Sequence, residues 1–132
     1  MNEAGSVVTR SLTTKGVGDA AESAALAHLK GFGLTLVRRN YRVARGPHAR
    51  GGEIDLILRE RDGTLVFVEV RRRTDGAYGG AAASVGASKQ RRLVLAARHF
   101  LAGMDPLPPC RFDIVAIDGE RVEWLRAAFD AA

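Results

Sequence analysis

The fold of this chain is decided by residues 52–72, which read GEIDLILRERDGTLVFVEVRR. Two runs rich in Ile, Leu, Val and Phe flank a short polar segment, a pattern typical of two β-strands joined by a tight turn. Each run also carries an acid, Asp55 in the first and Glu69 in the second. Burying an unpaired charge costs on the order of several kcal/mol, so we expect a cation or a nearby base to compensate these acids.

The turn between the runs determines whether the two acids meet. A three-residue loop at residues 61–63 would place Asp55 directly opposite Glu69 on one face of the sheet. A two-residue turn at 62–63 would shift the register by one residue and put the acids on opposite faces. We favour the first, because Gly63 suits the left-handed position after a type I turn. Opposed like charges destabilise a sheet, whereas a bound metal ion requires clustered anionic oxygens.

The rest of the chain predicts a single α/β domain. It contains no internal repeat and no linker, and we expect a flexible tail at residues 1–14 before a domain at residues 15–132. Small residues dominate residues 74–87, which we interpret as a long loop. The expected elements are helices at 14–30 (or 19–30) and 89–102, an antiparallel meander of strands at 34–43, 53–59 and 64–73, and further strands at 111–117 and 121–125.

Composition excludes several classes of protein. The 132 residues are 46% hydrophobic and 27% charged, as in a folded globular domain rather than a disordered chain. No apolar run approaches the roughly 20 residues that span a bilayer, and residues 1–14 show no apolar segment of signal-peptide type. We therefore expect a cytoplasmic protein with no membrane partner. The single cysteine, Cys110, excludes an intrachain disulfide and a Cys-based zinc site, and we expect it to be at least half-buried.

The positive charge of the chain suggests a polyanionic partner. The net charge is +5 and the sequence pI is about 10.1. A solvated basic surface is the alternative explanation. We expect this partner to be nucleic acid, and DNA in particular, whose phosphate backbone basic strips would hold independently of sequence. The residues predicted for this role are Arg39, Arg42, Arg50, Arg72, Arg73, Gln90 and Arg92.

A third carboxylate, Glu22, lies on the apolar stripe of the first predicted helix. It precedes Ala25, Leu26 and Leu29 by three, four and seven residues, so it extends the stripe that faces the core. Asp19 and Glu22 also fit the spacing of a capping box, in which Glu22 would only bond a backbone N–H. Local sequence favours neither interpretation.

In the predicted fold, Glu22, Asp55 and Glu69 converge with Lys89 or Gln90 at the start of the second helix. Two or three carboxylates near one point suit Mg²⁺ or Mn²⁺, which bind few protein oxygens and keep several waters. A metal-bound water can attack a phosphodiester while the cation and nearby Arg or Lys neutralise the developing charge. The arrangement outlines a hydrolytic nuclease.

This chain resembles the YraN family, which is assigned to the restriction-endonuclease-like PD-(D/E)XK superfamily near archaeal Holliday-junction resolvases. The resemblance covers roughly residues 15–126 and implies an αβββαβ core with a mixed four- to five-stranded sheet flanked by helices. It rests on the helix glutamate Glu22, the GEIDLI run at 52–57, the FVEV run at 67–70 followed by a base, the small-residue loop, Lys89, and Arg111-Phe112-Asp113.

The resemblance also implies roles for individual residues. Asp55 and Glu69 would bind the metal, Val70 would ligate through its carbonyl, and Glu22 would be the helix acid. The implied activity is a Mg²⁺-dependent endonuclease acting on branched DNA in repair or recombination. A homodimer would suit an enzyme that cuts both strands symmetrically.

Arg71 departs from the superfamily pattern, which places lysine two residues after the second acid. Arginine stays protonated and cannot act as a general base, but it can orient the scissile phosphate bidentately, and Lys89 can supply part of the missing function. The alternative is a non-catalytic nucleic-acid-binding module of the same fold. A structural or protein-interaction domain is a third class, and it would need no acid cluster. We expect Asp113 to pair with an arginine.

Overall fold

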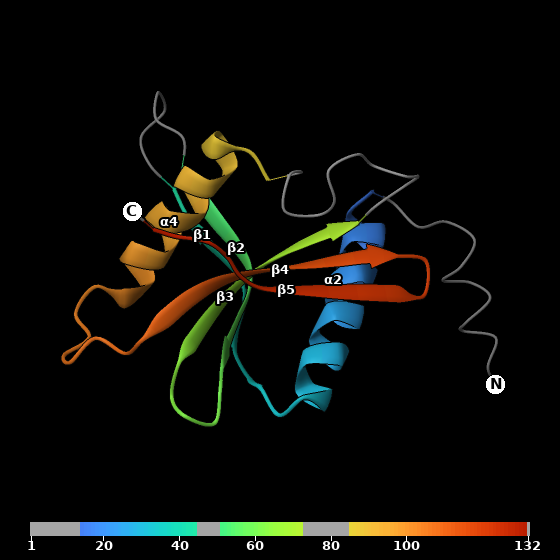
Figure 1. Cartoon of the computed structure of the whole chain (residues 1–132). Helices are drawn as coiled ribbons and strands as arrows, with labels where there is room; N and C mark the ends of the chain where they lie inside the picture. The colour runs from blue at the N-terminus through green and yellow to red at the C-terminus, as the bar shows by residue number, and fades with distance from the viewer. Residues whose placement is uncertain (1–13, 45–50, 73–84, 132) are drawn as a thin grey trace.

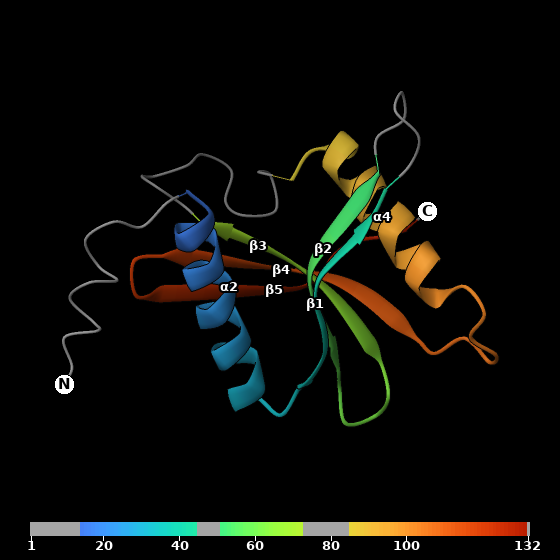
Figure 2. The ribbon, with the colours of Figure 1, turned by 180° about the vertical axis from the view of Figure 1, so that it is seen from behind.

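The computed structural model describes residues 14–44, 51–72 and 85–131. They form a five-stranded sheet with a helix on either face (Figures 1 and 2). The fold is α/β, as predicted. The elements are α2 (Thr14–Gly31), β1 (Thr35–Val43), β2 (Gly52–Arg59), β3 (Leu65–Arg72), α4 (Ala87–Leu101), β4 (Cys110–Asp118) and β5 (Arg121–Phe129).

The strands lie in the order β1-β2-β3-β4-β5, and the sheet is mixed. The first three strands form the predicted antiparallel meander. β3 and β4 are parallel, which requires a crossover connection, and this connection contains α4. β4 and β5 are antiparallel and complete the sheet.

The sheet separates two apolar cores, one under each helix. Ala21, Ala25 and Leu29 of α2 are buried against one face, as the apolar stripe predicted. Leu93 and Ala97 of α4 are buried against the other face. Because β3 lies between the two cores, its apolar residues are covered on both sides, which explains its nearly continuous apolar sequence.

The hairpin between β2 and β3 closes through the predicted three-residue loop. The backbone N–H of Glu60 donates to the carbonyl of Thr64 at 2.9 Å, and the N–H of Gly63 donates back to the carbonyl of Glu60 at 3.0 Å. Gly63 has a φ of 96°, the left-handed conformation that glycine adopts without steric cost. Continued along both strands, this register sets Asp55 opposite Glu69.

The sheet opens between β2 and β3 where these two acids lie. Pairing between the strands ends at Leu56 and Val68, although the structure describes both strands beyond this point. β2 continues alongside β1, and β3 continues alongside β4. Figures 1 and 2 show the resulting divergence: the β1–β2 arm runs toward the first turns of α4, and the arm of β3, β4 and β5 runs toward α2.

The alternation of side chains along β2 is interrupted at Asp55. Ile54 packs in the core under α4, whereas Leu56 packs in the core under α2, although two residues apart in a regular strand share a face. The matching position on β1 is Asn40, whose φ of 56° is positive. Both strands of this arm are therefore irregular beside the acid.

The structure decides one alternative that the sequence left open and corrects one expectation. Helix α2 begins at Thr14, the earlier of the two predicted starts, so Asp19 and Glu22 lie within the helix and do not form a capping box at its start. Cys110 is exposed rather than half-buried, because it is the first residue of β4 and precedes the covered part of the strand. The predicted tail and residues 74–84 of the predicted loop lie outside the described residues, apart from Thr14.

Candidate functional site

Asp55 lies where the sheet opens, and its carboxylate faces β3. Its Oδ2 accepts a hydrogen bond from the backbone N–H of Val70 at 2.8 Å, so the side chain bridges the two diverging strands. Burial, followed by the negative charge of Glu69, raises the pKa of Asp55 to about 7. The carboxylate is thus held in a place that resists its ionisation.

Glu69 is almost fully buried, with 3% of its surface exposed. Its Oε2 lies 3.5 Å from Nζ of Lys89 and 3.4 Å from Nη1 of Arg71. Its Oε1 is buried and makes no hydrogen bond to any residue that the structure describes. An unsatisfied buried oxygen is costly to the fold, and this one lies on an acid that already faces another acid.

Glu22 brings a third carboxylate from α2 toward the opening. Burial, and next the charge of Asp55, raise its pKa above the ordinary value, while Arg39 acts in the opposite direction. Nε of Arg39 lies 3.5 Å from Oε1 of Glu22, and its Nη2 donates to the carbonyl of Asp19 at 3.1 Å and to Oγ of Ser23 at 3.0 Å. Arg39 therefore fastens β1 to α2 and holds Glu22 in position.

The structure brings together Glu22, Asp55, Glu69, Arg71 and Lys89, all predicted from the sequence. The carboxylates interact electrostatically, and both bases contact Glu69. This convergence joins four elements, since the residues come from α2, β2, β3 and α4.

The residues predicted to contact nucleic acid are distributed differently. The side chain of Arg39 bonds to α2, and the side chain of Gln90 donates to the carbonyl of Val85 at 3.0 Å. Both side chains are therefore already engaged in contacts within the protein. Arg42 is well exposed and pairs with Glu53 at 3.4 Å. Arg72 is exposed at the end of β3, and Arg92 lines a pocket beside α4; Arg50 and Arg73 lie outside the described residues.

The acids fit a divalent cation of the magnesium type in donor chemistry. Among the residues that the structure describes, no group of three or more His, Cys, Asp or Glu side chains is close enough to hold a metal ion. Mg²⁺ needs fewer, because it is usually bound through one or two carboxylates and retains water. Asp55 and Glu69 provide that pair, and the unsatisfied Oε1 of Glu69 is an oxygen a cation would satisfy.

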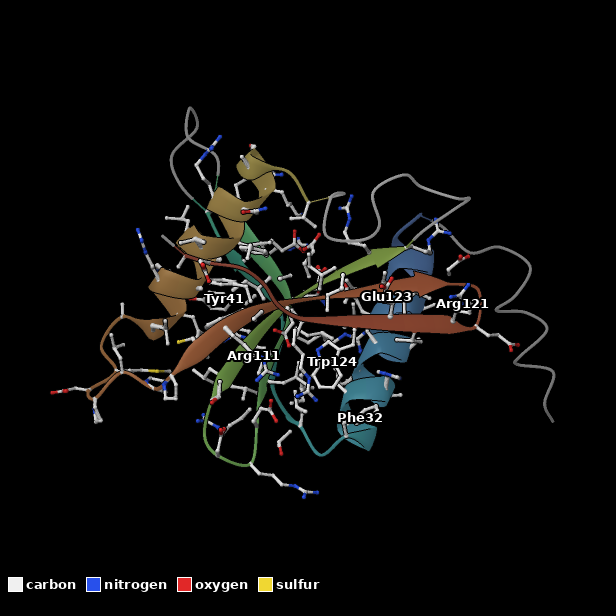
Figure 3. The ribbon with its side chains drawn as sticks, viewed as in Figure 1. Phe32, Tyr41, Arg111, Arg121, Glu123 and Trp124 are labelled. Carbon is white, nitrogen blue, oxygen red and sulfur yellow. The ribbon has the colours of Figure 1, made fainter. Side chains whose placement is uncertain are left out.

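Asp113 belongs to a separate structural network, and the predicted pairing with an arginine is confirmed. Nε of Arg111 donates to both of its carboxylate oxygens, at 3.0 and 3.1 Å. Nε1 of Trp124 and the backbone N–H of Ala127 donate to it at 2.9 Å each. Figure 3 shows Arg111 and Trp124 near each other on the sheet. These bonds tie β4 to β5 and occupy the carboxylate, while Arg111 also pairs with Glu60.

Sequence analysis missed the role of Gly52 and Glu53. α4 packs directly on the backbone of β2, so a Cβ built on Gly52 would lie 2.2 Å from the carbonyl oxygen of Arg92. Glu53 forms an ion pair with Arg42 beside this contact. The sequence did contain a sign of this packing, because a glycine at the start of a strand indicates that another backbone segment approaches closely.

The mixed five-stranded sheet with two helices is consistent with a restriction-endonuclease-like core, and its acids lie where the central strands part. The chain belongs to the uncharacterised protein family UPF0102, whose model matches residues 21–117. This confirms the resemblance to the YraN family, which is the same family.

Relatives in this family cover most of the chain. A UPF0102 protein of Methylibium petroleiphilum is 64% identical over 121 residues, which is 92% of this chain and 99% of the relative. One from an Acidovorax species is 62% identical over 91% of this chain and 89% of its own length. One from Cupriavidus taiwanensis is 59% identical over 86% and 82%. Within the described residues, no helix has the length and apolar character needed to cross a membrane.

Proposed function

We propose that this protein is a divalent-cation-dependent endonuclease that hydrolyses the phosphodiester bonds of DNA. The observation that carries the proposal is the proximity of Asp55 and Glu69 at the opening of the sheet, where the charge of Glu69 acts on Asp55 and a buried Glu69 oxygen has no hydrogen-bond partner among the described residues. Two basic side chains lie against the same acid. Acids that bind a cation next to bases that bind phosphate are the parts that phosphodiester hydrolysis requires.

Asp55 and Glu69 would hold Mg²⁺ or Mn²⁺, together with the carbonyl of Val70, and Glu22 lies close enough to influence the bound ion. The cation, when bound, supplies a water of lowered pKa and a positive charge close to the scissile phosphate. The hydrogen bond from the Val70 N–H keeps the carboxylate of Asp55 directed across the opening. The protein thereby fixes the donor oxygens before the cation arrives.

Lys89 and Arg71 would act on the phosphate. Both now neutralise Oε2 of Glu69, at 3.5 and 3.4 Å. Once a cation takes over that neutralisation, their N–H groups become available to the phosphate oxygens. Arg71 stays protonated, so its part is to orient the phosphate and stabilise negative charge rather than to accept a proton.

The proposal is tested by a cleavage panel with Mg²⁺ and with Mn²⁺. Substrates are four-way junctions, flaps, linear duplex DNA and RNA, because branched DNA in repair or recombination is the substrate we propose. Asp55→Ala and Glu69→Ala are run alongside the wild-type protein, and each is expected to abolish cleavage. Cleavage that survives both substitutions would come from a contaminant and would contradict the site assignment. Sedimentation on a junction substrate would show whether a homodimer binds it.

The second candidate is a nucleic-acid-binding module that does not cut. The observation that favours it is Arg71, which stands where the superfamily pattern has lysine and which already contacts Glu69. Calorimetric titration with Mg²⁺ separates the two functions. The binding module predicts no heat of metal binding and DNA binding that is unchanged by EDTA, whereas the nuclease predicts metal binding that Asp55→Asn removes.

A further inference from the structure

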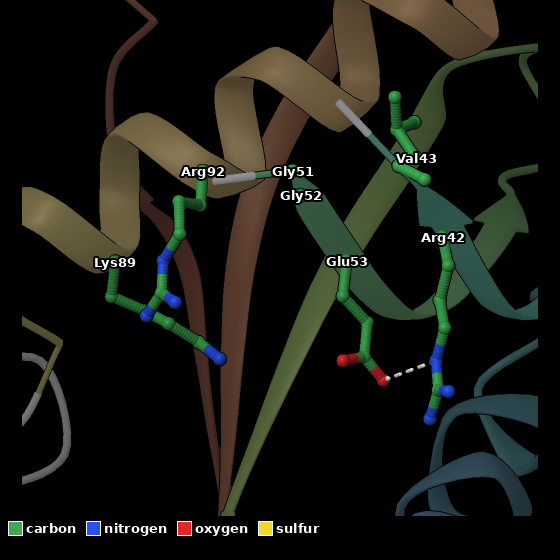
Figure 4. Close-up of a pocket in the computed structure, with 8 residues that line it drawn as sticks. Arg42, Val43, Gly51, Gly52, Glu53, Lys89 and Arg92 are labelled. Carbon is green, nitrogen blue, oxygen red and sulfur yellow. Dashed lines mark ion pairs between the residues drawn. The ribbon is translucent and has the colours of Figure 1, made fainter. Parts of the chain in front are cut away.

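A pocket of about 540 Å³ lies between the start of α4 and the β1–β2 arm. We call it the α4 pocket; its lining includes Arg42, Gly51, Gly52, Glu53, Lys89 and Arg92. Figure 4 shows the side chains of Lys89 and Arg92 extending from α4 into the space faced by Glu53 and Arg42. Its size is within the range of small-molecule binding sites.

The α4 pocket is rich in positive charge. Three cations and one acid line it, and Arg42 pairs with that acid, Glu53, at 3.4 Å. Lys89 is directed toward Glu69 at 3.5 Å. Arg92 remains, and among the residues that the structure describes it makes no ion pair.

Arg92 offers the pocket an unpartnered donor. Its Nε is buried and has no hydrogen-bond partner within the described part of the chain. A buried guanidinium N–H without an acceptor is costly, so the fold maintains a donor that an anion would satisfy. The backbone of Gly52 lies directly against the Arg92 carbonyl, which fixes this turn of α4 relative to β2.

The α4 pocket adjoins the acids through Lys89. This residue both lines the pocket and contacts Glu69. An anion beside Arg92 would thus share Lys89 as a neighbour with a phosphate at the acids. Guanidinium groups bind phosphate oxygens bidentately, which suits them to a nucleic-acid backbone.

We propose that the α4 pocket binds a backbone phosphate of the nucleic-acid strand next to the phosphate held at Asp55 and Glu69, with Arg92 as its principal donor. The inference rests on the proposed function for its substrate. It makes the substrate a polynucleotide rather than a mononucleotide, because two neighbouring phosphates are held at once.

The test is the salt dependence of DNA binding by the full chain in EDTA, where no cleavage occurs. A fluorescent duplex DNA oligonucleotide is titrated with wild type, Arg92→Gln and Arg91→Gln. Loss of one phosphate contact lowers affinity about eightfold at 0.1 M salt and reduces the slope of log K against log salt by about 0.9. Arg91 is the matched control: it is the adjacent, exposed arginine of α4 and lines a different pocket.

A second measurement follows the NMR signal of the Arg92 Nε–H group. Inorganic phosphate alone should shift this signal saturably, and the oligonucleotide should shift it at far lower concentration. Equal losses of DNA affinity for Arg91→Gln and Arg92→Gln would refute phosphate binding in the α4 pocket. An Arg92 signal that neither ligand shifts would refute it as well. Neither result bears on the cleavage assay. If Arg92→Gln loses DNA affinity but the wild-type protein does not cleave DNA, phosphate binding in the α4 pocket is supported and the proposed endonuclease activity is refuted.

Discussion

The charge of Asp55 is expected to destabilise the metal-free fold, and Asp55→Asn isolates that effect. The substitution removes the charge and keeps an oxygen that can accept the 2.8 Å hydrogen bond from Val70. Burial and the charge of Glu69 raise the pKa of Asp55 from 3.8 to about 7. The folded protein therefore binds this proton more tightly than the unfolded chain does.

The pKa shift gives the sign of the effect and its order of magnitude. Below pH 3.8 the carboxyl is protonated in both states, and its charge costs nothing. As the pH rises toward 7, the unfolded chain ionises first, so the stability of the wild type falls. A shift of about three units at 1.36 kcal/mol each gives a loss of roughly 4 kcal/mol, complete above about pH 7.

Urea unfolding in EDTA at pH 4, 6 and 8 measures this loss. The free energy of unfolding of Asp55→Asn is expected to exceed that of wild type by an amount that grows with pH to a few kcal/mol. Asp118→Asn removes a carboxylate from an exposed position and serves as the control. Adding Mg²⁺ at one hundred times its Kd should return about 2.7 kcal/mol to wild type only. A difference independent of pH, together with equal Mg²⁺ effects on both proteins, would refute the reasoning.

Three further predictions concern the scaffold around the site. Gly52→Ala is expected to lower the free energy of unfolding in urea by about 1–3 kcal/mol, because the new Cβ would lie 2.2 Å from the carbonyl oxygen of Arg92 in α4. Gly31→Ala is the control and should be nearly neutral in the same assay, because a Cβ at Gly31 meets nothing within 4 Å. Asp113→Asn should lower the free energy of unfolding in urea by about 1–3 kcal/mol, because it weakens the bonds from Arg111, Trp124 and Ala127 to a buried carboxylate while Arg111 keeps its ion pair with Glu60; a loss below 1 kcal/mol would contradict the network. Arg39→Gln should lower the thermal midpoint and weaken Mg²⁺ binding measured by calorimetry, because Glu22 loses the ion pair that positions it. Unchanged Mg²⁺ binding would show that Glu22 does not contribute to the metal site.

The hairpin register could be predicted because its determinants are local. A glycine at the end of a three-residue loop fixes which residues pair, and pairing then fixes which acids face each other. The apolar stripe of α2 was equally readable, since its period follows from helix geometry. These local features are enough to predict that Asp55, Glu69 and Glu22 lie near one another.

The opening of the sheet could not be predicted because its cause is tertiary. Nothing in the β2 sequence interrupts the strand, yet Ile54 and Leu56 pack in opposite cores. α4 packs on the backbone of β2 at Gly52, a contact between elements far apart in the sequence. The choice between the two starts of α2 was also open in the sequence, because the helix extends through a stretch with two glycines that intrinsic propensity disfavours.

The divergence of the two strands has a mechanical consequence. Asp55 belongs to the arm of β1 and β2, and Glu69 belongs to the arm of β3, β4 and β5. Any change in the angle between the two arms would therefore change the distance between the two carboxylates. A cation held by both acids would set that angle, so the binding event that completes the site would also stiffen the sheet where β2 and β3 part.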